Sequence, residues 1–106
     1  MLFRSYLVQN DGSLTNGKVF YDATPAVKEG KLKGLPDGMK IDKKGNLFAT
    51  GPGGVLIISP EGKLLGRIDT NEPTANCAWG DDGATLYITS NMYVYRIRTL
   101  VVGVGF

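Results

Sequence analysis

The sequence predicts an all-β fold built from antiparallel four-stranded blades of a β-propeller. Short runs of apolar and β-branched residues alternate with polar residues, which is the period-2 pattern of strands. The 15 glycines and five prolines among the 106 residues separate these runs and predict tight turns. A segment of roughly 40 residues is then repeated, which is typical of propeller blades. No window shows a convincing helical periodicity.

Nine strands are expected along the chain. They cover residues 3–8, 18–21, 38–41, 47–50, 55–58, 63–68, 75–79, 85–89 and 93–98. Asn10-Asp11-Gly12 predicts the first hairpin turn. The lysine-rich segment Thr24–Gly34, with Pro25 and Gly30, is expected to be a loop. The glycine-rich run 51–54 predicts a turn and not a phosphate-binding loop, because no Gly-Lys-Ser/Thr and no helix follow it.

The repeat defines the expected domain organisation. Leu47, Thr50 and Val55 recur as Leu86, Thr89 and Val94, each 39 residues later. Residues 1–106 therefore form one partial β-propeller domain: residues 1–22 end one blade, 38–68 form a complete blade, and 75–106 form an incomplete last blade. This is about two and a half blades, whereas a closed propeller needs at least about four. The expected core comprises Leu47, Val55, Ile57, Trp79, Leu86 and Ile88.

Composition excludes several function classes. A net charge of +2 gives no strong field for nucleic acid or a membrane surface, so neither is expected as a partner. The 106 residues contain no histidine, which excludes histidine-dependent triads and histidine-ligated metal sites within them. Cys77 is the single cysteine and is expected to be a small buried apolar side chain. No signal-peptide pattern is present, so a cytoplasmic location is the default expectation.

The stretch 35–42, with the sequence LPDGMKID, contains the acidic residue best placed for chemistry. Pro36 and Gly38 predict a tight turn, and the alternation that follows predicts a strand. Asp37 would then sit on a turn at the mouth of a strand, where a carboxylate can face a ligand. The same residue type also stabilises turns through its own backbone, so the residues alone leave both roles open.

The sequence resembles the C-terminal part of the gluconolactonase family, which includes senescence marker protein 30 (regucalcin). The motifs that carry the resemblance run through nearly the whole chain in matching order: DGSL at 11–14, LPDGMKID at 35–42, GNL at 45–47, GPGGV at 51–55, GKLLG at 62–66, ANCAWG at 75–80, TLYIT at 85–89 and YRIR at 95–98.

The resemblance implies a six-bladed propeller that hydrolyses sugar or related lactones, which is ester-bond hydrolysis, with one divalent cation, Ca²⁺ or Zn²⁺. In the family a glutamate, an asparagine and an aspartate hold that cation at the mouth of the central channel. Asp37 corresponds to the aspartate, which makes it the expected metal ligand and catalytic residue. Oxygen ligands suit a hard cation that polarises a carbonyl and lowers the pKa of a bound water.

The chain departs from the family because the glutamate and the asparagine have no counterpart in it. Asn16 matches a family hairpin turn, and Asn76 is not carried over as a ligand. We therefore expect a truncated lactonase that is not competent as a lone chain. The alternative is a non-catalytic β-sheet assembly or binding module, a remnant of a lactonase propeller. In either case open blade faces and edge strands predict a homo-oligomer, in the simplest case a dimer.

Overall fold

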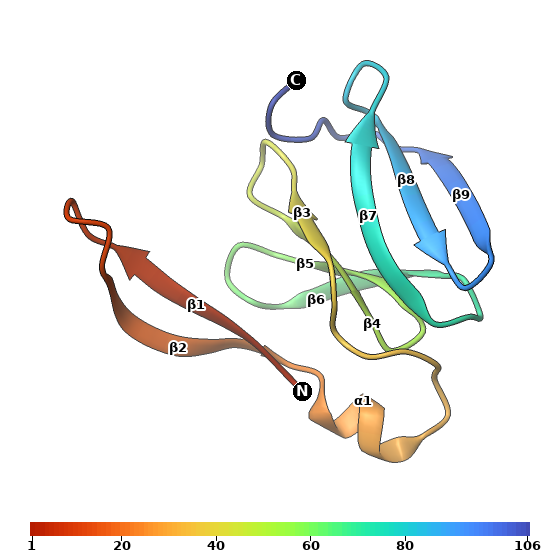
Figure 1. The fold of residues 1–106 in the computed structure, drawn as a ribbon, viewed down its shortest axis with the longest axis horizontal. Helices are drawn as coiled ribbons and strands as arrows, with labels where there is room; N and C mark the ends of the chain where they lie inside the picture. The colour runs from red at the N-terminus through yellow and green to blue at the C-terminus, as the bar shows by residue number, and fades with distance from the viewer.

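The computed structural model describes all 106 residues and contains nine strands and one short helix (Figure 1). The strands are β1 (Leu2–Val8), β2 (Leu14–Asp22), β3 (Met39–Ile41), β4 (Leu47–Gly51), β5 (Gly54–Ile58), β6 (Leu64–Asp69), β7 (Thr74–Gly80), β8 (Thr85–Ser90) and β9 (Tyr93–Arg98). Every expected strand is present, and the all-β prediction is confirmed. The largest difference is that β2 begins at Leu14, four residues before the expected start.

The strands form three separate antiparallel sheets. These are the hairpin β1–β2, the four-stranded sheet β3-β4-β5-β6 and the three-stranded sheet β7-β8-β9. Strand order follows chain order in each sheet, so tight turns suffice for the connections within a sheet. Both β4 and β8, which carry the repeated leucine and threonine, are second in their sheets. The sheets are open, as a partial propeller requires, and the division into blades at the stated residues stays a prediction.

The main core lies between the four-stranded and the three-stranded sheets. Phe48 and Val55 of the former pack with Cys77, Trp79, Leu86 and Ile88 of the latter. The rings of Phe48 and Trp79 meet edge to face, with centroids 4.9 Å apart. The indole Nε1 of Trp79 donates a hydrogen bond of 3.1 Å to the carbonyl oxygen of Ile41, which satisfies its polar atom. This core positions β7 beside β3.

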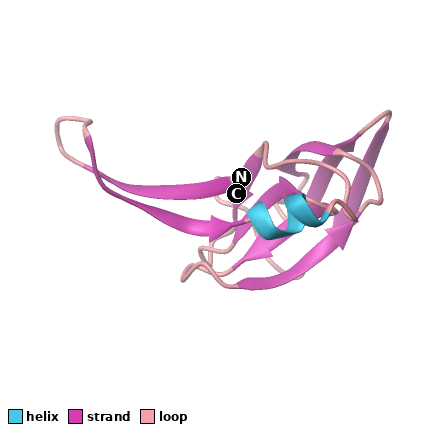
Figure 2. Cartoon of the chain, turned by 90° about the horizontal axis from the view of Figure 1, so that it is seen from below, coloured by secondary structure: helices cyan, strands magenta, loops and turns pink.

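A second cluster covers the opposite face of the four-stranded sheet. Phe3 and Ala23 pack on Ala49, Leu56 and Ile58. The middle strands β4 and β5 are therefore covered on both faces. Beyond this contact the β1–β2 hairpin extends away from the rest of the molecule (Figures 1 and 2).

Four of the six predicted core residues are confirmed: Val55, Trp79, Leu86 and Ile88 are buried. The prediction is wrong for Leu47 and Ile57, which are half-buried. Both pack against the clusters without being enclosed by them, Leu47 against the second and Ile57 against the main one. Strand alternation identifies which face a residue occupies but not how far along that face the covering layer extends.

The helix α1 (Thr24–Glu29) corrects the expectation of a loop after the first hairpin. It has six residues, with Pro25 in the first turn and Gly30 in the left-handed conformation (φ 72°) at its C-terminal end. Proline at the start and glycine just past the end favour a helix, although both residues also mark loops. A helix this short shows no apolar periodicity. The structure contains no helix with the length and apolar character needed to cross a membrane.

Candidate functional site

The predicted site residue Asp37 lies just before β3, where three parts of the chain meet. Its backbone N–H donates to the carbonyl oxygen of Thr50 at the end of β4 (3.2 Å). The next N–H, that of Gly38, donates to the carbonyl oxygen of Ala75 in β7 (2.9 Å). Thr50 N–H in turn donates to the carbonyl oxygen of Gly38 (2.9 Å). Asp37 is therefore mounted on backbone held by two sheets at once.

The predicted tight turn at Pro36-Asp37-Gly38 is wrong. The chain only bends at Pro36, and Gly38 does not adopt a positive φ. Its N–H bonds to a neighbouring sheet and not back across a turn. Glycine is needed here for a different reason: a Cβ at this position would overlap with the side-chain oxygen of Asn76. The absent side chain allows β7 to approach the Asp37 segment closely.

The hydroxyl of Thr50 ties these segments together. Thr50 is completely buried, and its Oγ1 lies 2.9 Å from the carbonyl oxygen of Gly38 and 3.2 Å from that of Ala75. The single hydroxyl proton is thus shared between the Asp37 segment and β7. The sequence pattern identified Thr50 only as a repeated residue. A threonine inside an otherwise apolar buried strand was the signal for a polar link.

A cavity of about 690 Å³ opens beside Asp37. Its size lies within the range of small-molecule sites, roughly 300–1,000 Å³. One wall is the segment that carries Asp37, and the other comes from the start of β7 and the β8–β9 turn. The lining residues are Gly34, Leu35, Pro36, Asp37, Pro73, Thr74, Ala75 and Asn91. The sequence analysis did not identify Asn91, because a lone asparagine in a predicted turn has a structural explanation.

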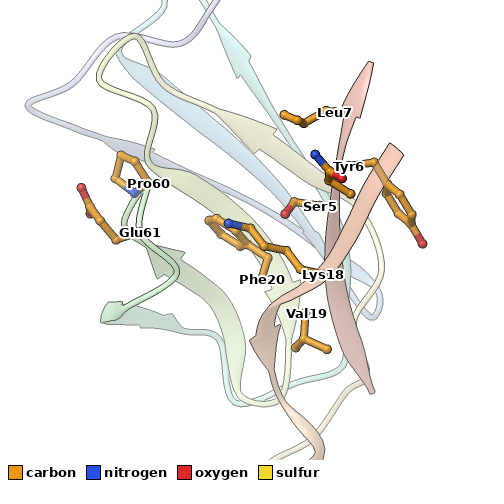
Figure 3. Close-up of a pocket in the computed structure, with 9 residues that line it drawn as sticks. Ser5, Tyr6, Leu7, Lys18, Val19, Phe20, Pro60 and Glu61 are labelled. Carbon is orange, nitrogen blue, oxygen red and sulfur yellow. The ribbon is translucent and has the colours of Figure 1, made fainter. Parts of the chain in front are cut away.

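A second cavity, of about 530 Å³, lies between the β1–β2 hairpin and the turn at Pro60 and Glu61 (Figure 3). Lys18 and Phe20 face it from β2, and Asn16 is also among its lining residues. It contains no predicted site residue, since Asn16 was expected to belong to a hairpin turn and not to a site. We place the candidate site at the first cavity because that cavity contains the predicted carboxylate.

The carboxylate of Asp37 has no partner within the chain. The residue is exposed, and its side chain takes part in none of the hydrogen bonds or ion pairs of the structure. Asp42, five residues later in the same motif, is the opposite case. It is completely buried, and its oxygens accept bonds from the backbone N–H of Lys44 and from the backbone and side chain of Asn46. Asp42 is therefore structural, whereas Asp37 is free to bind a ligand.

The exposed carboxylate of Asp37 has oxygens free for a ligand, but no ligating companions lie beside it. A partner-free carboxylate on fixed backbone beside a cavity suits a hard divalent ion. No group of three histidine, cysteine, aspartate or glutamate side chains gathers anywhere in the chain. The side-chain oxygen of Asn76 accepts the N–H of Cys77 (2.9 Å), which occupies one of its two lone pairs. A complete coordination shell therefore needs oxygens from beyond these side chains.

Cys77 is buried as predicted. Its Sγ lies 3.5 Å from the carbonyl oxygen of Phe48, and it packs in the main core. Burial raises the pKa of the thiol above its ordinary value, and the opposing effect of Lys40 is smaller. The thiolate that a nucleophile or metal ligand requires is thus disfavoured, which excludes Cys77 from the chemistry of the site.

Sequence comparisons show which known proteins the chain is similar to. The family model described as "SMP-30/Gluconolactonase/LRE-like region" matches residues 2–92. A gluconolactonase from Zymomonas mobilis is 51% identical over 74 residues, which cover 68% of this chain and 21% of that protein. Regucalcin from Danio rerio is 38% identical over 84 residues, covering 74% of this chain and 26% of that protein.

A solved structure shows the same arrangement. An X-ray structure assigned as a gluconolactonase superposes with a TM-score of 0.82 at 29% identity, covering 96% of this chain and 33% of that one. The chain thus spans about a fifth to a quarter of the curated relatives and a third of this structure.

Proposed function

The chain belongs to the SMP-30/gluconolactonase/LRE-like family, and from this premise we propose that it contributes Asp37 to a metal-dependent site that hydrolyses sugar or related lactones. The observation that carries the proposal is the free carboxylate of Asp37, which is held by the backbone of two sheets beside a cavity of small-molecule size. A rigidly mounted group without a partner in the chain is available to a ligand.

The reaction would open a cyclic ester. The oxygen of a water molecule attacks the lactone carbonyl carbon, the bond from that carbon to the ring oxygen breaks, and one water proton ends on the ring oxygen to give a hydroxy acid. Asp37 would hold the cation or accept the water proton, since a carboxylate can do either. A divalent cation, Ca²⁺ or Zn²⁺, would supply polarisation of the carbonyl and a lower pKa for water bound to it.

The other ligands of such a metal site lie outside these 106 residues. The relatives of the chain are several times longer than the segment it matches, and no second ligating carboxylate joins Asp37 here. We propose that the missing oxygens come from a further polypeptide or from another copy of the chain. Calcium takes six to eight oxygen ligands, so Asp37 and water alone would bind it only weakly.

The test is a metal-dependent lactonase assay on the purified chain. Acid release from glucono-δ-lactone would be followed above the spontaneous rate, with Ca²⁺, with Zn²⁺ and after addition of a chelator. If a second copy of the chain supplies the missing oxygens, we expect hydrolysis that the chelator abolishes and that Asp37→Asn removes; if a further polypeptide supplies them, we expect no hydrolysis by the purified chain alone. Asp11→Asn is the matched control, because Asp11 is an exposed aspartate in the β1–β2 turn, far along the chain from the cavity. Hydrolysis that survives the chelator would refute the metal-dependent proposal.

The second candidate function is a non-catalytic assembly or binding module. The observation that favours it is the exposed apolar surface of β9, where Tyr93, Val94, Tyr95 and Ile97 are all open to solvent. β9 is also an edge strand, with β8 as its one neighbour. Exposed apolar edge strands favour pairing with another chain. Self-association without lactonase activity, in the presence of metal, would favour this function over the first.

A further inference from the structure

Thr50 lies behind the cavity, at the joint between its two walls. It is not one of the lining residues, but its Oγ1 bonds to the carbonyl oxygens of Gly38 (2.9 Å) and Ala75 (3.2 Å). Gly38 directly follows Asp37 in the chain, and Ala75 lines the opposite wall of the cavity. One hydroxyl group is therefore bonded to the backbone behind both walls.

The two carbonyl oxygens have other partners besides this hydroxyl. The oxygen of Gly38 accepts the backbone N–H of Thr50 (2.9 Å), and the oxygen of Ala75 accepts the backbone N–H of Gly38 (2.9 Å). A carbonyl oxygen has two lone pairs, so each can also accept the hydroxyl proton. A valine at position 50 would suit a buried strand and would leave neither carbonyl unpaired. The hydroxyl of Thr50 therefore adds a link between two segments that are already paired.

The repeat provides a comparison for this threonine. Thr89 occupies the equivalent place 39 residues later, in β8, but it is exposed. Its Oγ1 lies 3.4 Å from the carbonyl oxygen of Asn76, which belongs to the neighbouring strand of the same sheet. Thr50 is completely buried and bonds across to β7, a strand of a different sheet. A link between sheets is thus a property of Thr50 and not of the repeated position.

The place of the Asp37 carboxylate depends on such backbone contacts. Its side chain is exposed and has no hydrogen-bond or ion-pair partner in the chain that could orient it. The backbone N–H of Asp37 donates to the carbonyl oxygen of Thr50 (3.2 Å), so the same residue holds this segment through both its backbone and its hydroxyl. A functional group keeps its geometry when the residues that support it are fixed by packing and hydrogen bonds.

We propose that Thr50 is a positioning residue, whose hydroxyl group holds the backbone of Asp37 against β7 and so sets the place of the carboxylate at the cavity. The proposal rests on the proposed function, because it assigns Thr50 to the site to which Asp37 contributes. Thr50 acts through Asp37 and touches no ligand itself, since it does not line the cavity.

Three variants of the full chain separate this role from a general effect on folding. Thr50→Val replaces the hydroxyl with a methyl group, which cannot approach a carbonyl oxygen as closely, whereas Thr50→Ser keeps the hydroxyl. Thr89→Val makes the same change at the equivalent, exposed position of the repeat. If Thr50→Val does not fold, Thr50→Ala removes the hydroxyl without placing a methyl group between the carbonyl oxygens.

The first measurement is native-state hydrogen exchange of the Gly38 amide, which bonds to the carbonyl oxygen of Ala75. Local opening of the joint exposes this amide without unfolding the whole chain. We expect exchange at least about threefold faster in Thr50→Val, after correction for any change in global stability measured by urea unfolding. Thr50→Ser should restore the wild-type rate, and Thr89→Val should not change it. Equal exchange in wild type and Thr50→Val would overturn the proposal.

The second measurement is calorimetric titration with Ca²⁺ and with Zn²⁺. The Kd should rise about two- to tenfold in Thr50→Val, the range for loss of one neutral hydrogen bond, and should return to the wild-type value in Thr50→Ser. A merely structural role would lower the stability and leave the Kd of the folded chain unchanged. Metal binding that depends on Asp37 but not on Thr50 would therefore overturn the proposal.

The two measurements also distinguish this proposal from the proposed function. Exchange at Gly38 that responds to Thr50, with no metal bound by the wild-type chain, would support the hold of Thr50 on the Asp37 segment. The same result would count against a metal site in the chain alone.

Discussion

The carboxamide of Asn76 packs directly against the backbone of Gly38, with no room for a side chain between them. A Cβ on Gly38 would overlap with Asn76 Oδ1 and would also lie 3.0 Å from the carbonyl oxygen of Ala75. This contact joins the Asp37 segment to β7. The position of the catalytic carboxylate that we propose therefore depends on a glycine that follows it in the chain.

We predict that Gly38→Ala destabilises the chain by about 1–3 kcal/mol, the usual cost of overpacking. Urea unfolding of wild type and variant measures the difference. Asn76→Ala in the same chain should recover part of the loss, because it removes the overlapping oxygen but leaves the Ala75 carbonyl in place. Additive effects of the two substitutions would show that the residues do not interact as the structure describes.

The repeat supplies a matched pair for testing the core. Val55 and Val94 occupy equivalent places in β5 and β9, but Val55 is 0% exposed and Val94 is 72% exposed. We predict that Val55→Ala costs roughly 1–3 kcal/mol, because it leaves a cavity between the two sheets. Val94→Ala should change the free energy of unfolding by less than about 0.5 kcal/mol. Equal costs would mean that another surface covers β9 in solution.

The buried thiol predicts a dependence of stability on alkaline pH. The folded state raises the pKa of Cys77 above the ordinary 9.0, so above pH 9 the unfolded chain loses this proton while the folded chain keeps it. Unfolding is therefore favoured as pH rises through that window. We expect wild type to lose more stability between pH 8 and pH 10 than Cys77→Ala, in which the other titrating groups remain. Urea melts of both proteins at the two pH values provide the measurement.

Metal binding provides a test of Asp37 that is independent of activity. We predict that calorimetry detects weak binding of Ca²⁺ or Zn²⁺ and that Asp37→Asn weakens it further. Because the carboxylate has no partner in the chain, the substitution should leave the free energy of unfolding within about 0.5 kcal/mol of wild type. Asp11→Asn should bind metal as wild type does. Identical isotherms for wild type and Asp37→Asn would remove Asp37 from the metal site.

The positions of the strands could be predicted from the sequence because each strand carries its own local signal. Glycine, proline and asparagine at the turns and β-branched residues between them located all nine strands. The helix α1 was missed because six residues cannot show a helical period, and its capping residues, Pro25 and Gly30, also mark loops. Leu47 and Ile57 were expected in the core but are only half-buried, because burial depends on how far the neighbouring layer extends and not on the residue type alone.

The candidate site was only partly predictable because its walls come from distant parts of the chain. Asp37 was found through its motif, and the structure places it beside a cavity. The predicted role of Gly38 was wrong. The sequence suggested that glycine supplies an unusual backbone angle in a turn, whereas in the structure the absence of a side chain leaves room for Asn76 to pack against the backbone. A threonine within an apolar strand signalled that Thr50 makes a polar link, but its partners Gly38 and Ala75, like the Glu72 partner of Asn91, come from distant parts of the chain that no local pattern specifies.

The exposed apolar surface of the chain predicts self-association. Leu7, Val8 and Leu14 are exposed on the projecting hairpin, and Val94 and Leu100 are exposed at the other end of the chain. Apolar surface of this extent on edge strands favours association with a second copy. We predict that sedimentation at micromolar concentration gives at least twice the 11.4 kDa mass of one chain.

Two substitutions locate the contact. A lysine on an apolar edge strand opposes strand pairing, because pairing would bury its charge. Val94→Lys should therefore reduce the dimer fraction if β9 forms the interface, and Val8→Lys should do so if the β1–β2 hairpin forms it. Both side chains are exposed in the single chain, so neither change should affect its folding by more than about 0.5 kcal/mol. A stable 11.4 kDa species at every concentration would refute the prediction. It would mean that the exposed apolar surfaces of the hairpin and of β9 remain in contact with water without driving association.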